Sequence, residues 1–397
     1  MAHISFHSLR PLLPIGLSMV LVGVVALSGC SSAPKTVWKP VAVPTSTVVG
    51  TVAIPAPFTA RGVPADLAAV IRPLCLGGAF ASSPSADKAL RRRQPVNPAG
   101  SVVAVGAVAS WKGVPIAVVT TGKDVTLAVK VHRWRVVGGW RPSLGVPTPS
   151  LGSLLRRVLL AGSDARPGES LDGFRADSLH IVGFDGRVGG ALGIARDSYV
   201  PLASGGSGRI NSALTFGGPL GLQRTVTSVT GVPLEGYILT GFDGFEELVG
   251  GIGGLPLNVP VAVKDDLSGA NVKAGPNVLT PGQALAYGRA RHAVAGGDFG
   301  RSANQGLLIL AAAGFAKQVG PMKLPGILQM GAPKIETSMS AEQVLTFAAG
   351  VYATQPNKVH NRVATRGFGW TADRQSIVLL DANARRLFAD IRDGNLL

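Results

Sequence analysis

Cysteine is scarce in this sequence of 397 residues, which contains only Cys30 and Cys75. Cys30 ends an apolar N-terminal run that is expected to be processed, so Cys75 has no partner for an internal disulfide. Without a second thiol or a nearby histidine, Cys75 is expected to be a buried apolar residue rather than a nucleophile. The fold must therefore be held by its core, and a hydrophobic content of 46% is sufficient for a substantial one.

Acidic residues are also few: 22 Asp and Glu stand against 38 Lys and Arg, a formal net charge of +16. Charged residues make up only 15% of the chain, and small Ala, Gly and Val residues are frequent, which argues against general disorder. A balance this basic indicates a polyanionic partner. Nucleic acid, anionic lipid headgroups and phosphate esters are the three candidate classes.

The apolar run Leu12–Leu27 is shorter than the roughly 20 residues that a membrane-spanning helix needs, and it follows a single charged residue, Arg10. Small residues lead from it into Cys30, as in a bacterial lipobox, so residues 1–29 are predicted to be a lipoprotein signal peptide and Cys30 to be acylated. The alternative is an uncleaved anchor helix with an incidental cysteine. Both predict a protein on the outer face of the cytoplasmic membrane, and this location excludes nucleic acid.

Composition divides the rest of the chain into three parts. Residues 30–60 are rich in Pro, Thr, Ser and Val and read as a tether. Residues 61–150 form a β-rich accessory region, with a short helix around 65–71 and a small antiparallel meander over 101–140. Pro-rich sequence at 141–152 marks a boundary, after which residues 151–397 form the main domain.

In the main domain, predicted strands and helices alternate. Strands are expected at 157–162, 178–184, 191–195, 236–240 and 375–381. Helices are expected at 218–231, 241–252, 280–291, 298–318, 340–353 and 382–392. This alternation predicts an α/β class, with an α/β/α sandwich around a mixed central sheet.

Several familiar catalytic patterns are missing: the sequence has no histidine pair at metal-ligand spacing, no G-x-S-x-G and no Walker-type loop. Instead, four groups of acids and arginines follow predicted strands or stand at helix ends. They are Asp164 with Arg166, Arg175 with Asp177, Arg196 with Asp197, and Arg289 and Arg291 with Asp298 and Arg301.

Each group alone is compatible with a surface salt bridge. Together they indicate more, because ligands gather where strands end in α/β sheets and arginine recognises phosphate oxygens bidentately. Aspartates beside such arginines suit a magnesium ion that bridges phosphate oxygens. The pattern favours phosphoryl transfer by positioning and charge neutralisation. His180 and His292 lie near these groups and are read as incidental.

Spaced motifs from about Leu155 onward occur in an order that resembles the LytR–CpsA–Psr family of cell-wall glycopolymer ligases. They are SDAR, FRADS, IVGFD, IARDSYV, RINSALTFGG, TPGQALAYGRARH and DFGRSANQ. The resemblance implies a phosphotransferase that moves a glycan phosphate from a polyprenyl-pyrophosphate carrier to peptidoglycan, with Mg²⁺ as its cofactor. Its partners would be the lipid-linked glycan, the peptidoglycan acceptor and, through the lipid anchor, the membrane.

The resemblance also implies roles for individual residues. Asp164 and Asp177 would bind the metal, and either Asp197 or Asp298 would activate the acceptor hydroxyl. The catalytic set implied is Arg175, Asp177, Arg196, Asp197 and Asp298. The set implied for pyrophosphate binding is Arg166, Arg175, Arg196, Asn211, Arg289, Arg291, Arg301 and Gln305. The apolar face of residues 306–316 would help to form a slot for the polyprenyl tail.

Two motifs depart from the family pattern. Ala195 stands where proline is usual before the strand-end arginine, and Asn304-Gln305-Gly306 replaces Arg-Gln-Gln. The loss of an arginine would weaken phosphate binding or change the acceptor. Two alternatives to the ligase stay open at this point: a polyprenyl-pyrophosphate phosphatase, in which water is the acceptor, and a non-catalytic lipoprotein that binds polyprenyl phosphates.

Overall fold

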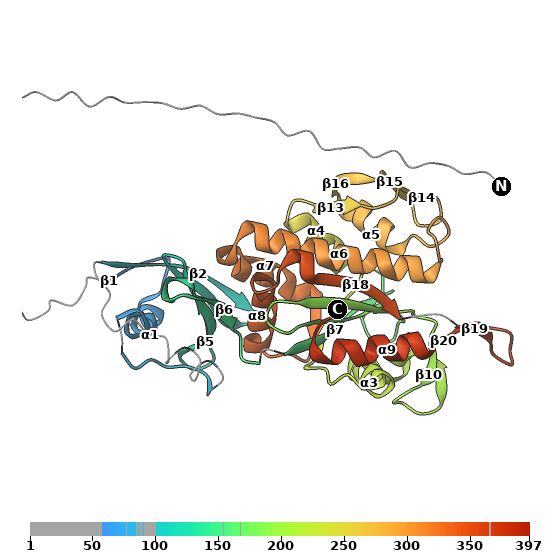
Figure 1. Ribbon diagram of the computed structural model, residues 1–397, viewed down its shortest axis with the longest axis horizontal. Coiled ribbons are helices and arrows are strands. Elements are labelled where there is room, and N and C mark those ends of the chain that lie inside the picture. Colours follow the sequence, from blue (N-terminus) through green and yellow to red (C-terminus); the bar gives the residue numbers. More distant parts are fainter. Residues whose placement is uncertain are drawn as a thin grey trace, which may run out of the picture. The chain divides into compact units, whose positions relative to one another are not determined.

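The computed structural model describes residues 58–76, 78–84, 86, 90, 101–153, 155–166, 168–364 and 367–397 (Figure 1). The predicted signal peptide, Cys30 and nearly all of the predicted tether lie outside these residues. Among the helices that are described, none is by itself long and apolar enough to cross a membrane. The two segments Asp298–Val319 and Pro321–Lys334 are long and apolar enough when they are counted together, but they meet at a bend of 107°.

A six-stranded mixed sheet forms the centre of the main domain. In spatial order its strands are β17 (Ile335–Thr337), β12 (Tyr237–Thr240), β7 (Arg156–Ser163), β8 (Ala176–Phe184), β9 (Gly189–Ile194) and β18 (Val359–Ala364). The pairs β12–β7 and β9–β18 are parallel, and the other three pairs are antiparallel. The α/β class with a mixed sheet is therefore confirmed. The short, polar edge strands β17 and β18 carry no apolar alternation and were not predicted.

Helices cover both faces of this sheet. Figure 1 shows α3 (Ser212–Thr230) and α9 (Ala382–Asp390) on one face, where Leu159, Ile181 and Leu192 of the strands meet Leu222 and Phe388 of the helices. The helix expected from residue 218 is in fact the second half of α3. A kink at Gly218, with a φ of 61°, precedes Pro219, so the pattern was read as a helix start.

The other face of the sheet carries α4 (Phe242–Gly251), α5 (Pro281–Arg289) and α6 (Asp298–Val319) (Figure 1). Helix α5 begins as predicted, at a capping box in which Thr280 and Gln283 satisfy each other's backbone N–H groups. It ends at Arg289 rather than Arg291. Beyond α4 and α5, two small antiparallel sheets form a separate apolar cluster around Tyr287: β13 (Leu255–Val259) with β16 (Gly275–Leu279), and β14 (Val263–Asp265) with β15 (Ala270–Val272).

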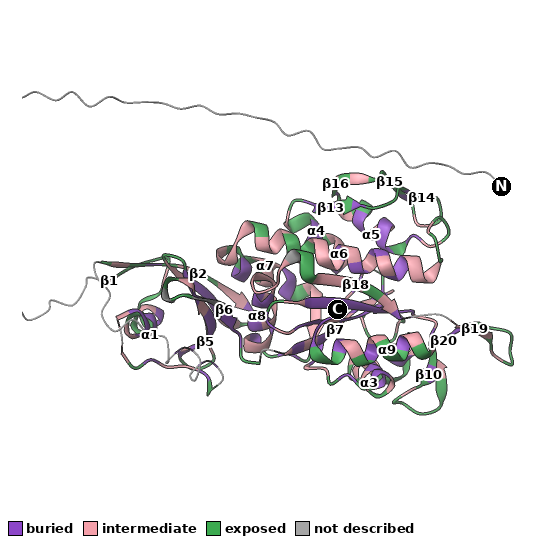
Figure 2. Ribbon diagram, viewed as in Figure 1, coloured by how far each residue is buried: buried purple, intermediate pink, exposed green. Residues whose placement is uncertain are grey.

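The accessory region is a second six-stranded sheet. Its strands, in spatial order, are β1 (Phe58–Arg61), β2 (Val102–Trp111), β3 (Val114–Thr121), β4 (Asp124–Lys130), β5 (Trp134–Arg141) and β6 (Val146–Ser150). Helix α1 (Ala65–Leu76) packs Leu67 and Ile71 on one face, where Cys75 is buried as expected. The opposite face packs on α7 (Leu324–Gly331) and α8 (Ala341–Ala349), and these two helices also contact the main sheet. Figure 2 shows buried residues along both sheets.

A short hairpin of β19 (Gly367–Trp370) and β20 (Ser376–Leu379) extends from the main domain (Figure 1). The strand expected at 375–381 is therefore present, but it pairs with β19 and not with the main sheet. A backbone hydrogen bond from Val378 to Asp197, 2.9 Å long, fastens the hairpin near the end of β9.

Candidate active site

The first two acid–arginine groups meet because β7 and β8 are antiparallel neighbours, which places the end of one beside the start of the other. The backbone N–H of Arg175 donates to Oδ1 of Asp164 at 2.7 Å, and that of Asp164 donates to the Arg175 carbonyl at 3.0 Å. Burial raises the pKa of Asp164, and the nearby negative charge of Asp177 raises it further. Asp164 and Asp177 are thus close enough for their charges to interact.

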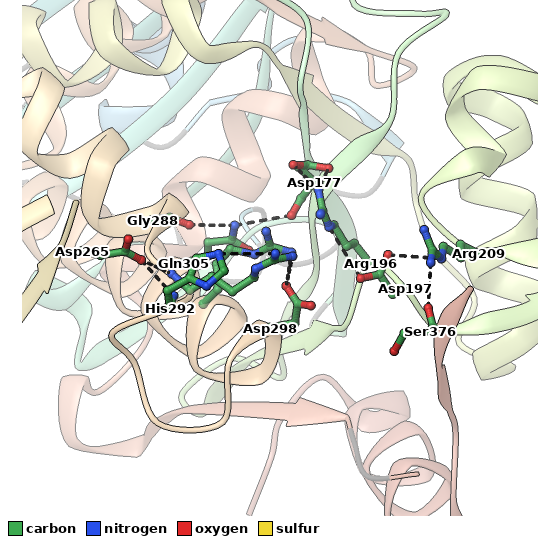
Figure 3. A network of polar contacts seen from close by, with 12 residues as sticks. Asp177, Arg196, Asp197, Arg209, Asp265, Gly288, His292, Asp298, Gln305 and Ser376 are labelled. Atoms are coloured by element: carbon green, nitrogen blue, oxygen red, sulfur yellow. Dashed lines mark hydrogen bonds and ion pairs between the residues drawn. The ribbon is translucent and has the colours of Figure 1, made fainter. Parts of the chain in front are cut away.

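Arg196 follows β9 and reaches back across the sheet edge to β8 (Figure 3). Its Nη1 lies 2.6 Å from both carboxylate oxygens of Asp177. Burial disfavours the charged form of Arg196, but Asp177 and Asp197 outweigh that effect and raise its pKa. Arg196 therefore remains a fixed positive charge at the end of the sheet.

Asp197 is held between two arginines. Its carboxylate lies 3.9 Å from Nε of Arg196 and 3.6 Å from Nε of Arg209, on β11 (Ser207–Arg209). Arg209 in turn donates to the carbonyl of Ser376 on the β19–β20 hairpin at 2.8 Å (Figure 3). Burial, followed by the charge of Asp298, raises the pKa of Asp197 against the lowering effect of these arginines. Arg209 was not predicted as a site residue.

The segment between α5 and α6 supplies the remaining charges. Nη2 of Arg301 lies 2.7 Å from Oδ1 of Asp298, one helical turn earlier, and Nη1 of Arg291 lies 3.8 Å from the same oxygen. Arg301 is 7% exposed. Burial lowers its pKa, and so does the positive charge of Arg196. A buried guanidinium that faces another guanidinium indicates a place for an anion.

Asp265, on β14, fixes this segment and was not predicted. Its Oδ2 accepts hydrogen bonds from the backbone N–H groups of Arg291, at 2.7 Å, and His292, at 2.9 Å. Its Oδ1 accepts from those of Leu267 and Ser268. These bonds, led by that from Arg291, hold the pKa of Asp265 down at about 2. The only sequence signal was a turn-forming Asp beside small polar residues.

A cavity of about 640 Å³ opens beneath these groups. Arg196, Arg289, Arg291 and Arg301 line it together with Asp177 and Gln305. The rest of its wall is mainly apolar, from β7, α4, α6 and α7, and includes Leu160, Phe245, Leu308, Phe315 and Ile327. Arg289 lies over the ring of Phe242, 4.9 Å from its centroid. The cavity is thus apolar inside with a cationic wall.

The predicted residues fall into two sets. Six line the cavity: Asp177, Arg196, Arg289, Arg291, Arg301 and Gln305. Six do not: Asp164, Arg166, Arg175, Asp197, Asn211 and Asp298. In the second set, Asn211 is buried and joins the ends of β8 and β9 through its backbone. Its N–H donates to the Arg196 carbonyl, and its own carbonyl accepts from the Ala176 N–H, both at 3.1 Å. Arg166 donates from its backbone N–H to Oε2 of Glu169 at 2.6 Å, and its carbonyl accepts from the backbone N–H of Glu169 at 3.0 Å.

Ala195, the first departure from the family pattern, is buried directly after β9. The other two, Asn304 and Gly306, lie on the buried face of α6. Asn304 is 9% exposed and is not among the residues that line the cavity. At Gly306, an added Cβ would come within 2.0 Å of Oδ1 of Asn361 on β18. Asn361 also donates from Nδ2 to the Ala303 carbonyl at 2.7 Å. Gly306 therefore allows α6 to approach β18 closely.

His180 is fully buried, and burial lowers its pKa to about 4. Its Nε2 lies 3.0 Å from the carbonyl of Ser302. A neutral ring that bonds to the backbone fits the expectation of a structural histidine. Among the residues that the structure describes, no group of three or more His, Cys, Asp or Glu side chains is placed to bind a metal ion. The assignment of Asp164 and Asp177 to a metal stays a prediction, and in this structure both carboxylate oxygens of Asp177 lie against Arg196.

Residues 155–382 match the model of the LytR_cpsA_psr family. Regulatory protein MsrR of Staphylococcus aureus strain Mu50 is 34% identical over 154 residues, which is 37% of this chain and 45% of MsrR. The polyisoprenyl-teichoic acid–peptidoglycan teichoic acid transferase TagU of Bacillus anthracis strain CDC 684 is 36% identical over 155 residues, 37% of this chain and 48% of TagU. The chain thus spans about half the length of the curated relatives it matches.

Solved structures share the fold. Bacillus subtilis TagV superposes with a TM-score of 0.51 and 26% identity, covering 60% of this chain and 97% of TagV. A protein from Streptococcus agalactiae superposes with a TM-score of 0.53 at 18% identity, over 61% of this chain and 89% of its own. The family match covers more than half of the 397 residues and includes every acid–arginine group described above. The chain belongs to the LytR–CpsA–Psr family.

Proposed function

We propose that this protein transfers a glycan phosphate from a polyprenyl-pyrophosphate carrier to peptidoglycan. The observation that carries the proposal is that one cavity is lined both by apolar side chains and by four arginines. A polyprenyl pyrophosphate has the same two parts, an apolar chain and a strongly anionic head. The volume of about 640 Å³ also falls within the range of sites that enclose much of a ligand.

In this reaction a hydroxyl group of peptidoglycan attacks the phosphorus atom that carries the glycan. The bond from that phosphorus to the bridging oxygen breaks, polyprenyl phosphate leaves, and the hydroxyl proton passes to a carboxylate. Arg196 and Arg301 neutralise the charge that accumulates on the leaving phosphate. Asp197 and Asp298 are the two candidate bases. The similarity to TagU, a transferase of teichoic acid to peptidoglycan, supports this class of reaction.

Magnesium fits the carboxylates that are present. Burial is the main reason that the pKa of Asp164 is raised, and the negative charge of Asp177 adds to it; a bound divalent cation would favour the charged form of both carboxylates. Mg²⁺ commonly binds one or two protein carboxylates and completes its octahedron with water and substrate phosphate. Bound there, it would neutralise phosphate charge and hold the pyrophosphate in place.

We also propose that acylated Cys30 anchors the protein to the outer face of the cytoplasmic membrane, where a lipid-linked donor resides. In a producing bacterium, the wild-type protein should incorporate labelled fatty acid and sediment with membranes. Cys30→Ser should incorporate no label. Equal labelling of both proteins would overturn the anchor.

Transfer can be measured with a labelled polyprenyl-pyrophosphate glycan and purified peptidoglycan. Arg196→Ala should lower the yield of peptidoglycan-bound label at least about a hundredfold, since it removes a charge from the transition state. Arg385→Ala, at an exposed position on α9, is the matched control and should be unaffected. Label released into water instead would establish a phosphatase, and donor binding without turnover would establish a carrier protein.

A further inference from the structure

A second, open groove of about 1020 Å³ meets the arginine cavity at Arg291 and His292, which line both. One wall is the loop that joins α5 to α6, including Gly296 and Gly297. The other wall includes Phe299, at the start of α6, and Phe368, on the β19–β20 hairpin. The groove therefore leads outward from the arginines to two aromatic rings.

The aromatic side of this groove is strongly exposed. Phe368, which lines the groove, is 72% exposed. Trp370 does not line the groove, but it is also 72% exposed and lies two residues further along β19, so it continues the same face of the hairpin. The Phe368 ring lies 5.5 Å from that of Phe299, which fixes its position at the groove. Large exposed aromatic residues that are grouped in this way mark a binding surface.

The hairpin is also tied to the catalytic groups. Val378 donates from its backbone to Asp197, and Arg209 bridges the Asp197 carboxylate and the Ser376 carbonyl (Figure 3). These contacts hold the base of the hairpin beside the strand-end arginine, so its aromatic face has a defined place relative to the site.

Building on the proposed function, we infer that this groove binds the glycan strand of the peptidoglycan acceptor, with Phe368 and Trp370 as stacking residues. The C–H face of a pyranose ring packs well on the face of an aromatic ring. In phosphoryl transfer the attacking and leaving oxygens lie roughly in line on opposite sides of the phosphorus. A leaving polyprenyl phosphate belongs to the apolar cavity, so the attacking hydroxyl comes from the other side.

The carboxylates are distributed in keeping with this direction. Asp298 lines the groove and does not line the apolar cavity, whereas Asp177 lines the cavity and not the groove. A hydroxyl that enters along the groove therefore meets a carboxylate able to accept its proton. The groove thus has the position, the aromatic surface and the proton acceptor that an acceptor sugar requires.

Binding can be measured without turnover, by calorimetric titration with a soluble oligosaccharide of alternating N-acetylglucosamine and N-acetylmuramic acid. Phe368→Ala and Trp370→Ala should each weaken affinity by about tenfold, as loss of an aromatic anchor commonly does. Trp370→Phe should retain most of it. Phe216→Ala is the matched control, because Phe216 is 69% exposed but lies on α3, which covers the face of the main sheet opposite α6 and the groove.

Absence of oligosaccharide binding by the wild-type protein, or equal affinity in all these variants, would overturn the groove assignment. Should Phe368→Ala fail to fold, Trp370→Ala decides, since that side chain is mostly in solvent. In transfer assays the variants should raise the half-saturating concentration of acceptor and leave that of the donor unchanged. A rise for the donor alone would place the donor's glycan here instead. Oligosaccharide binding without any transfer would contradict the proposed function but not the groove.

Discussion

Asp265 acts on the site at the scale of one residue, and it does so through backbone groups. Its carboxylate fixes Arg291 and His292, the two residues shared by the cavity and the groove, by accepting hydrogen bonds from their N–H groups. An amide side chain at this position would offer one oxygen where the carboxylate offers two. The loop between α5 and α6 therefore depends on a charged acceptor.

Asp265→Asn should destabilise the protein in a pH-dependent way. The folded-state pKa of about 2 lies below the ordinary 3.8, so the carboxylate stabilises the fold above about pH 4. That contribution is lost as the pH falls from about 4 through about 2. Urea unfolding at pH 7, 4 and 2.5 should show a wild-type advantage that shrinks toward low pH. Asp266→Asn, at an exposed neighbour, is the control, and a constant difference between wild type and Asp265→Asn would contradict the prediction.

The two candidate bases should behave differently. Asp298 lines the groove, whereas Asp197 is held between Arg196 and Arg209. Asp298→Asn should therefore lower kcat by about a hundredfold or more, the usual contribution of a general base. Asp197→Asn should mainly raise the donor KM, because it removes one of the two carboxylates that hold Arg196 in place and leaves Asp177 as the other. Single-turnover rates at saturating donor separate the two, and the reverse pattern would make Asp197 the base.

The sequence allowed the arginines and aspartates to be found because each stands beside a strongly apolar strand or a capped helix, and because the motifs are spaced as in the family. It gave no comparable indication for Arg209 or Asp265. Arg209 lies on a three-residue strand that pairs with β10 (Tyr199–Pro201), and its partner Ser376 is 167 residues away in the chain. Contacts of that kind depend on tertiary structure and leave no local pattern.

At the scale of elements, α6 combines three tasks along its length. Its first turn carries Asp298 and Arg301, and Gly306 packs against β18. Further along, Leu308, Ile309, Ala312 and Phe315 line the cavity. An apolar cavity therefore lies along residues 306–316, where the sequence predicts one, because the length and apolar character of this helix can be read from the sequence. The contact of α6 with β18 could not be predicted, because the sequence of that strand is largely polar.

Gly306→Ala should destabilise the protein by about 1–3 kcal/mol, as overpacking of a tight contact does. The new methyl group would overlap Asn361, and α6 would have to move away from β18. Adding Asn361→Ala should recover part of the loss, although it removes one hydrogen bond. Gly314→Ala is the matched control on the same helix: it has open space around it and should be neutral or slightly stabilising. Thermal melting of the four proteins tests this, and equal effects at both glycines would contradict it.

At the scale of the whole described chain, the accessory sheet and the main domain share a core. Ile116, Val118 and Leu127 of the accessory sheet pack in one cluster with Leu345 of α8 and Val158 of the main sheet. Arg135 also pairs with Glu342 across this contact at 2.9 Å. Composition showed a β-rich segment and a Pro-rich boundary, but it gave no sign that both faces of that segment would be covered.

Because that core is shared, the accessory sheet and the main domain should unfold together. Tryptophan fluorescence, which reports mainly on the accessory sheet through Trp111, Trp134 and Trp140, should give the same urea midpoint as far-UV circular dichroism. A chain that starts at residue 151 should be poorly soluble, since it exposes the apolar face of α7 and α8. Two separate midpoints in the full chain, or a soluble and fully active truncation, would contradict a shared core.

Arg291 and His292 form a common wall between the cavity and the groove, and one carboxylate fixes both. Two ligands can then be present at once, on either side of the same guanidinium group, with no need for a covalent enzyme intermediate. Steady-state kinetics should accordingly follow a sequential scheme, in which double-reciprocal lines at different acceptor concentrations intersect rather than run parallel. A single molecule with an alkyl tail, a diphosphate mimic and a disaccharide would occupy both sides and act as a bisubstrate inhibitor.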